Sequence, residues 1–127
     1  KDGAEENNTG LAIGQGQIQV FYLHATNRCP SCNAIEAGTR KTIDTYFKSQ
    51  LEKKEILFSV LNIEEPANKE ITEKYQAIGP TLLVIYLDKD KKEVVNDLTG
   101  DGFRYALNDE SQFISVLKAA IEEALNK

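Results

Sequence analysis

Methionine and tryptophan are absent from this sequence of 127 residues, and cysteine occurs only twice. Two cysteines are too few for a disulfide framework, so the fold must depend on a hydrophobic core. No apolar run approaches the roughly 20 residues that a membrane-spanning helix needs, so we expect no membrane span. The formal net charge of −5 leaves no basic excess, which argues against nucleic acid and anionic membrane surfaces as partners.

The N-terminal stretch differs in composition from the rest of the chain. Residues 1–16 are polar and contain several glycines, a composition that favours a flexible leader. Because an initiator methionine is also missing, we expect that an N-terminal segment was removed by processing or truncation. A single domain is then predicted over residues 17–127. A leader of this kind favours a periplasmic or lipid-anchored location over the cytoplasm.

Hydrophobic periodicity predicts strands that alternate with helices. Runs rich in β-branched and aromatic residues predict four strands, at residues 17–23, 56–63, 81–87 and 93–98. Helical spacing of apolar residues predicts three helices, at residues 30–51, at 66–78 and from Asp109 to the C-terminus. A polar turn at 88–92 predicts a hairpin, and Gly100–Gly102 predicts a loop. The order β-α-β-α-β-β-α predicts an α/β fold with a mixed sheet flanked by helices.

The two cysteines lie three residues apart, at the start of the first predicted helix. Random placement would give this spacing only about 1–2% of the time. A helix start offers Cys29 unpaired N–H groups and the positive end of the helix dipole, and Arg28 adds a charge, so we expect a stabilised thiolate. Cys32 follows one turn later and can reach Cys29. The pair is therefore interpreted as a redox dithiol, with Cys29 as nucleophile and Cys32 as resolving thiol.

Other interpretations of the pair stay open. A static disulfide would close too small a loop to stabilise much, and a zinc half-site would have only His24 as a further soft ligand, so no metal is expected. A pair without a role is the third alternative. His24 and Glu36 are candidate proton carriers, but the sequence favours a hydrogen-bonded strand-end role for His24 and an exposed helix position for Glu36. The charge run at 88–92 is interpreted as a solvated turn.

Beyond these inferences, the chain resembles the thioredoxin superfamily over residues 17–126. The segments that carry the resemblance are the strand–loop–helix unit around Cys29-Pro30-Ser31-Cys32, the stretch Val60–Glu64, and Lys74-Tyr75 followed by Gly79–Val84. The resemblance implies a thioredoxin-like fold with a central sheet of four to five strands.

The resemblance also implies a substrate groove. Pro80 would be cis and lie against the dithiol, and the backbone at Gly79 would pair with a substrate chain. Arg28, Gly79 and Pro80 are therefore predicted to bind substrate.

Several residues depart from the pattern of thioredoxins. Arg28 stands in place of their tryptophan, and Pro30-Ser31 in place of Gly-Pro. Leu23 would occupy the position of their buried aspartate, which removes the usual proton acceptor of the second thiol. A narrower pattern is similar to thioredoxin-like proteins described as subunits of a nitrophenyl-compound nitroreductase, although nothing here resembles a flavin site. The residues of that pattern are His24-Ala25-Thr26 and Arg28-Cys29.

Together these features predict a thiol–disulfide oxidoreductase that needs no cofactor. We expect a monomer that acts on a disulfide- or thiol-bearing protein or small molecule and exchanges electrons with a redox partner. Two alternatives are a thioredoxin-fold binding module with an inert disulfide, and a protein that handles a metal or metalloid through its thiols.

Overall fold

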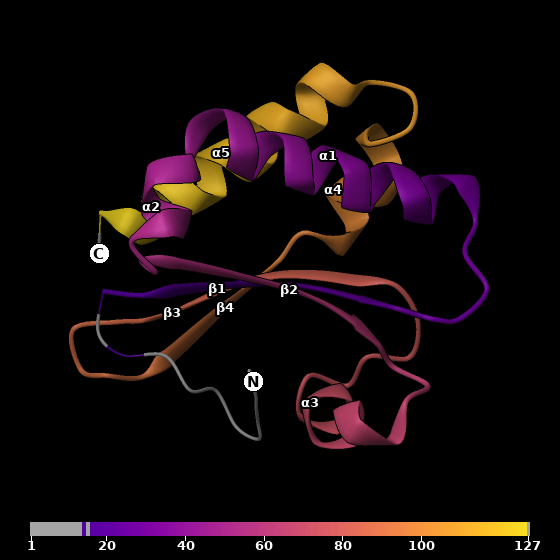
Figure 1. Cartoon of the computed structure of the whole chain (residues 1–127), viewed down its shortest axis with the longest axis horizontal. Coiled ribbons are helices and arrows are strands. Elements are labelled where there is room, and N and C mark those ends of the chain that lie inside the picture. The colour runs from indigo at the N-terminus through magenta and orange to yellow at the C-terminus, as the bar shows by residue number, and fades with distance from the viewer. Residues whose placement is uncertain (1–13, 15, 127) are drawn as a thin grey trace.

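The computed structural model describes residue 14 and residues 16–126 (Figure 1), so most of the predicted leader lies outside the described residues. Its centre is a four-stranded mixed sheet in the order β2-β1-β3-β4. Strand β1 pairs in parallel with β2 and antiparallel with β3, and β3 forms the predicted hairpin with β4. The strands are β1 Ile18–His24, β2 Ile56–Asn62, β3 Thr81–Leu87 and β4 Glu93–Asp97.

Helices cover both faces of this sheet. Figure 1 shows α1, α2, α4 and α5 together on one face, and α3 on the other. The first group comprises α1 Pro30–Tyr46, α2 Lys48–Glu52, α4 Thr99–Tyr105 and α5 Glu110–Leu125. The second comprises the short 3₁₀ helix η1 Pro66–Asn68 and α3 Lys69–Lys74. The predicted α/β architecture is confirmed, with four strands in the sheet.

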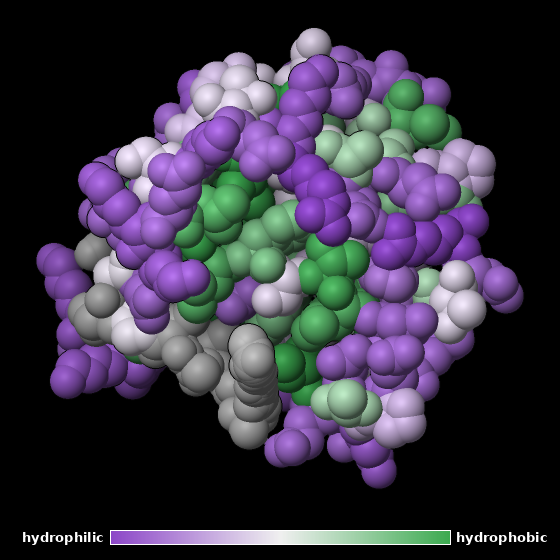
Figure 2. Space-filling view, in the orientation of Figure 1, coloured by the Kyte–Doolittle hydropathy of each residue, from purple (hydrophilic) through white to green (hydrophobic). Residues whose placement is uncertain are grey.

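Two apolar clusters fill the space between the sheet and its helices. Strand β1 contributes to both, because successive side chains of a strand point to opposite faces. Tyr22 lies in the larger cluster, with residues of α1 and α5, whereas Leu23 lies in the smaller cluster on the α3 face. On the side of the molecule in Figure 2, hydrophobic side chains gather in the middle, over the sheet, and hydrophilic ones surround them.

The first predicted helix is divided in two. Phe47 takes a non-helical backbone conformation (φ −131°, ψ 20°) and separates α1 from α2. Its side chain is buried in the larger cluster. The continuous apolar spacing of the sequence gives no sign of this break, because Phe47 is a core position in either arrangement.

The second predicted helix is shorter than expected. It ends at Lys74, and Gln76 has a positive φ of 55°, which takes the chain out of the helix. Ile78, predicted to lie on the apolar side of this helix, is 99% exposed instead. Strand β2, predicted to be buried, is an edge strand and is half-buried along most of its length.

The predicted loop at Gly100–Gly102 is wrong, because these residues begin helix α4. The reason is packing: Gly102 is buried, and a Cβ there would lie 3.1 Å from the side chain of Ile35. The last helix is confirmed. Asp109 caps it by accepting a hydrogen bond from the Gln112 N–H at 3.3 Å.

No helix among residues 16–126 is both long and apolar enough to cross a membrane.

Gly38 provides a test of the packing between α1 and α5. A Cβ at this position would lie 2.7 Å from two ring carbons of Phe113, which is itself buried. Gly38→Ala gains about 1 kcal/mol of helix propensity, but overpacking a core costs about 1–3 kcal/mol. We expect urea unfolding to give a net destabilisation of about 1 kcal/mol.

Gly100→Ala is the matched control, because no described atom lies within 4 Å of a Cβ added there. This change in α4 should be neutral or stabilise the fold by up to about 1 kcal/mol. Equal effects of the two substitutions would contradict the close approach of α1 and α5 at Gly38.

Candidate functional site

Cys29 is the N-cap residue of α1. Its backbone is extended (φ −88°, ψ 168°), and Pro30 occupies the first helical position, where no N–H is needed. The Cys29 sulfur accepts a hydrogen bond from the Cys32 N–H at 3.2 Å, as a capping side chain does. The thiol is exposed, so the helix start presents it to solvent.

The surroundings of Cys29 favour its thiolate. A hydrogen bond from the Cys32 thiol and another from the Cys32 N–H lower the pKa of Cys29, together with smaller contributions from other backbone N–H groups. The expected stabilisation by the helix start is thus present.

Cys32 has the opposite character. Its side chain is buried, and burial raises the pKa of this thiol, as does its hydrogen bond to Cys29. Both cysteines are free thiols, close to each other at the first turn of α1. The exposed thiol therefore ionises before the buried one, which is the order that the predicted roles require.

Tyr22, and not Leu23, lies beneath Cys32. The buried Tyr22 hydroxyl donates a hydrogen bond to the Cys32 carbonyl oxygen at 3.0 Å. Leu23 is the next residue on β1, so its side chain points to the opposite face of the sheet. The expectation that Leu23 takes the place below the second thiol is therefore wrong. The alternation of Ile18, Val20 and Tyr22 along the strand was the signal that could have found this residue.

Arg28 makes a different contact from the one expected. Its guanidinium forms an ion pair with the Glu36 carboxylate, which also pairs with Arg40 at 2.8 Å. The largest contributions to the lowered pKa of Cys29 come from Cys32 and the backbone N–H groups of the helix start, and not from Arg28. Glu36, which Arg28 shares with Arg40, offsets part of the Arg28 charge, so the helix start and Cys32 are the main groups that stabilise the thiolate.

Glu36 is not the exposed helix residue that the sequence predicted, because its side chain is only 17% exposed. Burial alone would raise the pKa of its carboxyl group, but the hydrogen bonds from Arg40 and Arg28 outweigh this and lower it. A carboxylate held in this way is a structural partner of the two arginines.

His24 has the strand-end role that the sequence favoured. It is the last residue of β1, and its Nδ1 lies 2.8 Å from the Ala25 carbonyl oxygen. The Arg28 Nε lies 3.3 Å from the same ring nitrogen. Within residues 16–126, no three histidine, cysteine or acidic side chains lie together in a way that could hold a metal ion.

The register of the sheet brings the predicted substrate-binding segment Gly79-Pro80 to the same end of the sheet as the dithiol. Leu23 pairs with Thr81, so the end of β1 and the start of β3 are adjacent. Gly79 and Pro80 immediately precede β3, and the loop to Cys29 immediately follows β1.

The expectation of a cis Pro80 is wrong. The Gly79–Pro80 peptide bond is trans, as are the other peptide bonds among the described residues. An isolated X–Pro bond favours trans by about 0.5–1 kcal/mol, and only the resemblance implied the other isomer. Here the Gly79 carbonyl accepts a hydrogen bond from the Thr81 hydroxyl at 2.9 Å.

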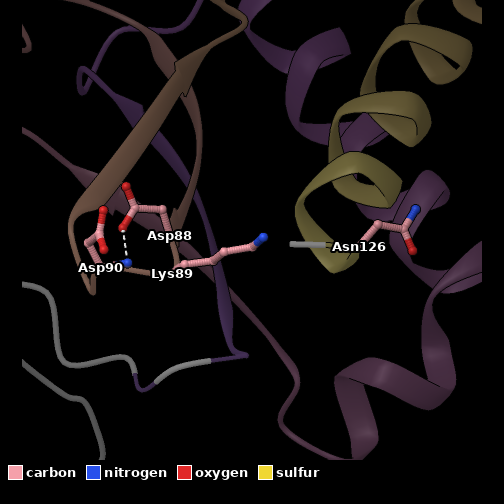
Figure 3. Close-up of a pocket in the computed structure, with 4 residues that line it drawn as sticks. All are labelled: Asp88, Lys89, Asp90 and Asn126. Atoms are coloured by element: carbon pink, nitrogen blue, oxygen red, sulfur yellow. Dashed lines mark hydrogen bonds between the residues drawn. The ribbon is translucent and has the colours of Figure 1, made fainter.

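A depression lies at the end of β3 that is opposite to the dithiol, and its chemistry differs from that of the dithiol (Figure 3). It lies between the β3–β4 turn and the end of α5, where Asp88, Lys89, Asp90 and Asn126 line it. Asp88 Oδ1 accepts hydrogen bonds from the backbone N–H groups of Asp90 and Lys92 at 2.8 and 2.9 Å. The acidic side chain holds the turn, which agrees with the predicted solvated hairpin turn.

Comparison with known proteins supports the fold. No known family profile matches the sequence, and no curated protein matches it either. Among solved structures, a thioredoxin from Thermus thermophilus is similar, with a TM-score of 0.55, 15% identity, and coverage of 86% of this chain and 77% of that one. The Trx4 domain of ERdj5 has a TM-score of 0.54 and 12% identity, with 87% and 81% of the two chains covered.

Full-length ERdj5 is also similar, with a TM-score of 0.58 and 12% identity over 88% of this chain. The match covers only 14% of the length of ERdj5. At these identities the likeness concerns the fold, and this chain has a thioredoxin-like fold.

Titration of Cys29 tests the electrostatics of the site. Because the pKa of Cys29 is lowered chiefly by its hydrogen bond with the Cys32 thiol, its alkylation rate should reach half its maximum below the ordinary thiol value of about 8.5. Cys32→Ser removes this thiol, so the alkylation midpoint of Cys29 should rise. In the native protein, the Cys29 thiol should react faster than the Cys32 thiol. A Cys29 that titrates as a free thiol would contradict this account.

Glu36→Gln tests whether the carboxylate masks Arg28. Loss of the ion pair leaves the Arg28 charge unbalanced beside Cys29, so the alkylation midpoint of Cys29 should fall by roughly half a unit. Glu110→Gln, which breaks the Lys41–Glu110 pair, is the control and should leave the midpoint unchanged. An unchanged or higher Cys29 midpoint after Glu36→Gln would contradict the masking of Arg28.

Proposed function

We propose that this protein is a thiol–disulfide oxidoreductase whose redox dithiol is Cys29-Pro30-Ser31-Cys32. One observation carries the proposal. An exposed Cys29 thiol with a lowered pKa caps α1, and Cys32, whose buried thiol has a raised pKa, donates to it one hydrogen bond from its backbone N–H and one from its thiol. A static disulfide or a chance pair of cysteines has no need of this difference in ionisation and access.

The proposed reaction is a two-step exchange, written here in the reducing direction. The Cys29 thiolate attacks one sulfur of a substrate disulfide, forming a mixed disulfide and releasing the first substrate thiolate. Cys32 then loses its proton and attacks the Cys29 sulfur. The intramolecular disulfide forms, the second substrate thiolate leaves, and two electrons have passed from the dithiol to the substrate. A redox partner of the thiol–disulfide class restores the dithiol, and the reverse sequence oxidises a substrate.

The substrate groove is part of this proposal. Arg28 directly precedes Cys29, and the Gly79-Pro80 segment directly precedes β3, whose start pairs with the end of β1; this arrangement supports their predicted role in binding. A Cβ at Gly79 would have no described atom within 4 Å, so the backbone there is open to an approaching chain. The substrate is a protein or small molecule that bears a disulfide or thiols. Action as a monomer outside the cytoplasm also belongs to the proposal, and the location rests only on the composition of residues 1–16.

A redox titration with a turnover assay tests this function. We expect the dithiol to equilibrate with glutathione or dithiothreitol at a potential above about −300 mV, where exchange partners can reach it. The native protein should accelerate the reduction of insulin by dithiothreitol, and Cys29→Ser should abolish this activity. Cys32→Ser should accumulate a mixed disulfide through Cys29.

A potential below that range, together with no turnover, would favour the binding module with an inert disulfide. Tight binding of a soft metal ion by the reduced protein, lost in Cys29→Ser and accompanied by no turnover, would favour metal handling.

A further inference from the structure

Tyr22 is a buried titratable group beside the dithiol that the two-step exchange does not yet use. Its side chain is fully buried within the larger apolar cluster. A hydroxyl is tolerated in such a place only when it is hydrogen-bonded. Here the hydroxyl bonds to one residue: it donates to the Cys32 carbonyl oxygen at 3.0 Å, and the Cys32 thiol is near enough for the two side chains to shift each other's pKa.

The chemistry of a phenol limits what Tyr22 can do for Cys32. Burial and the neighbouring Cys32 raise the pKa of Tyr22, so the hydroxyl keeps its proton and cannot act as a base near neutral pH. A protonated hydroxyl can still accept a hydrogen bond from a thiol and donate one to a thiolate. Donation to the charged form favours that form, and this interaction opposes the effect of burial on the pKa of Cys32.

We propose that Tyr22 is a positioning residue of the resolving step, whose hydroxyl turns from the Cys32 carbonyl oxygen to the Cys32 sulfur and stabilises the thiolate that attacks the mixed disulfide. This inference rests on the proposed function. It gives the neutral Tyr22 hydroxyl the place next to the second thiol, where the resemblance had put only Leu23.

The step balances without a proton leaving Tyr22. The Cys32 thiol gives its proton to water, and its sulfur forms a bond with the Cys29 sulfur. The bond between the Cys29 sulfur and the substrate sulfur breaks, and the departing thiolate keeps the electron pair and takes a proton from water. Tyr22 contributes a hydrogen bond throughout and is neither oxidised nor deprotonated.

Besides each other, Tyr22 and Cys32 are influenced by two further groups, whose effects a test has to hold constant. The Cys29 thiol interacts with both Cys32 and Tyr22, and the Arg28 guanidinium acts on Tyr22. Cys29→Ser removes the first interaction and leaves a single thiol to titrate, and it keeps Arg28 in place.

The ionisation of Cys32 therefore tests the inference without turnover. In Cys29→Ser protein, the Cys32 thiol is titrated by NMR of isotope-labelled cysteine, with and without Tyr22→Phe. Loss of the donor should raise the pKa of Cys32 by about one unit. Tyr75→Phe is the matched control, since it removes a half-buried tyrosine hydroxyl, bonded to Glu93 at 2.6 Å, from the opposite face of the sheet. An unchanged Cys32 pKa in Tyr22→Phe, or an equal rise in Tyr75→Phe, would overturn the inference.

Single-turnover kinetics locate the effect in the reaction. With glutathione disulfide, Tyr22→Phe should leave the first attack by Cys29 unchanged and slow the release of the second glutathione about tenfold. Equal slowing of both steps would mean a general structural role and overturn the inference. If the native protein never releases the second glutathione, the proposed function fails, whereas the titration of Cys32 still decides the role of Tyr22.

Replacement of Tyr22 by fluorotyrosine provides a second variant that keeps the shape of the ring. The more acidic phenol is a stronger donor, so the pKa of Cys32 should fall, opposite to the change in Tyr22→Phe. A rise with both substitutions would contradict a hydrogen bond to the thiolate.

Discussion

The burial of strand β1 on both faces is the constraint on which the site depends. β1 pairs with a strand on each side, and its side chains alternate between the two apolar clusters. This alternation puts Tyr22 beneath the first turn of α1 and Leu23 on the far side of the sheet. The same strand ends at His24, and the dithiol follows a few residues later. The dithiol therefore lies at the end of the sheet where β3 starts. A slip of one residue would exchange the two faces and remove the tyrosine from Cys32.

The groups that stabilise the Cys29 thiolate are local, and most of them belong to the backbone and to the dithiol itself. Cys29 caps α1, and Cys32 provides the N–H and the thiol that donate to its sulfur. The charge of Arg28, although adjacent in sequence, is held by Glu36, which Arg40 also contacts. Proximity along the chain therefore overstated the part played by Arg28, because an ion pair redirects the guanidinium.

Sequence patterns predicted the elements whose side chains repeat with a strong period. β1 and β3 agree with their predicted ranges within one residue, because their runs of β-branched and aromatic side chains have few alternatives. The errors occur where packing competes with a local signal. The helix breaks at Phe47, whose ring is buried in the larger cluster, and Gly102 lies within α4 in close contact with Ile35, although glycines predict a loop. The isomer at Pro80 and the place of Leu23 came from resemblance, and neither agrees with the structure.

The sequence by itself determined the α/β order, the four strands and the position of Cys29-Pro30-Ser31-Cys32 at a helix start. These are properties of residue periodicity and of proline at the first helical turn, which act over a few residues. Only the tertiary structure decided that Cys32 is buried while Cys29 is exposed, that Glu36 holds Arg28, and that Tyr22 reaches Cys32. Each of these depends on how α1 lies over β1 and on which face each strand residue takes. Such contacts arise from packing between segments, and spacing along the chain does not encode them directly.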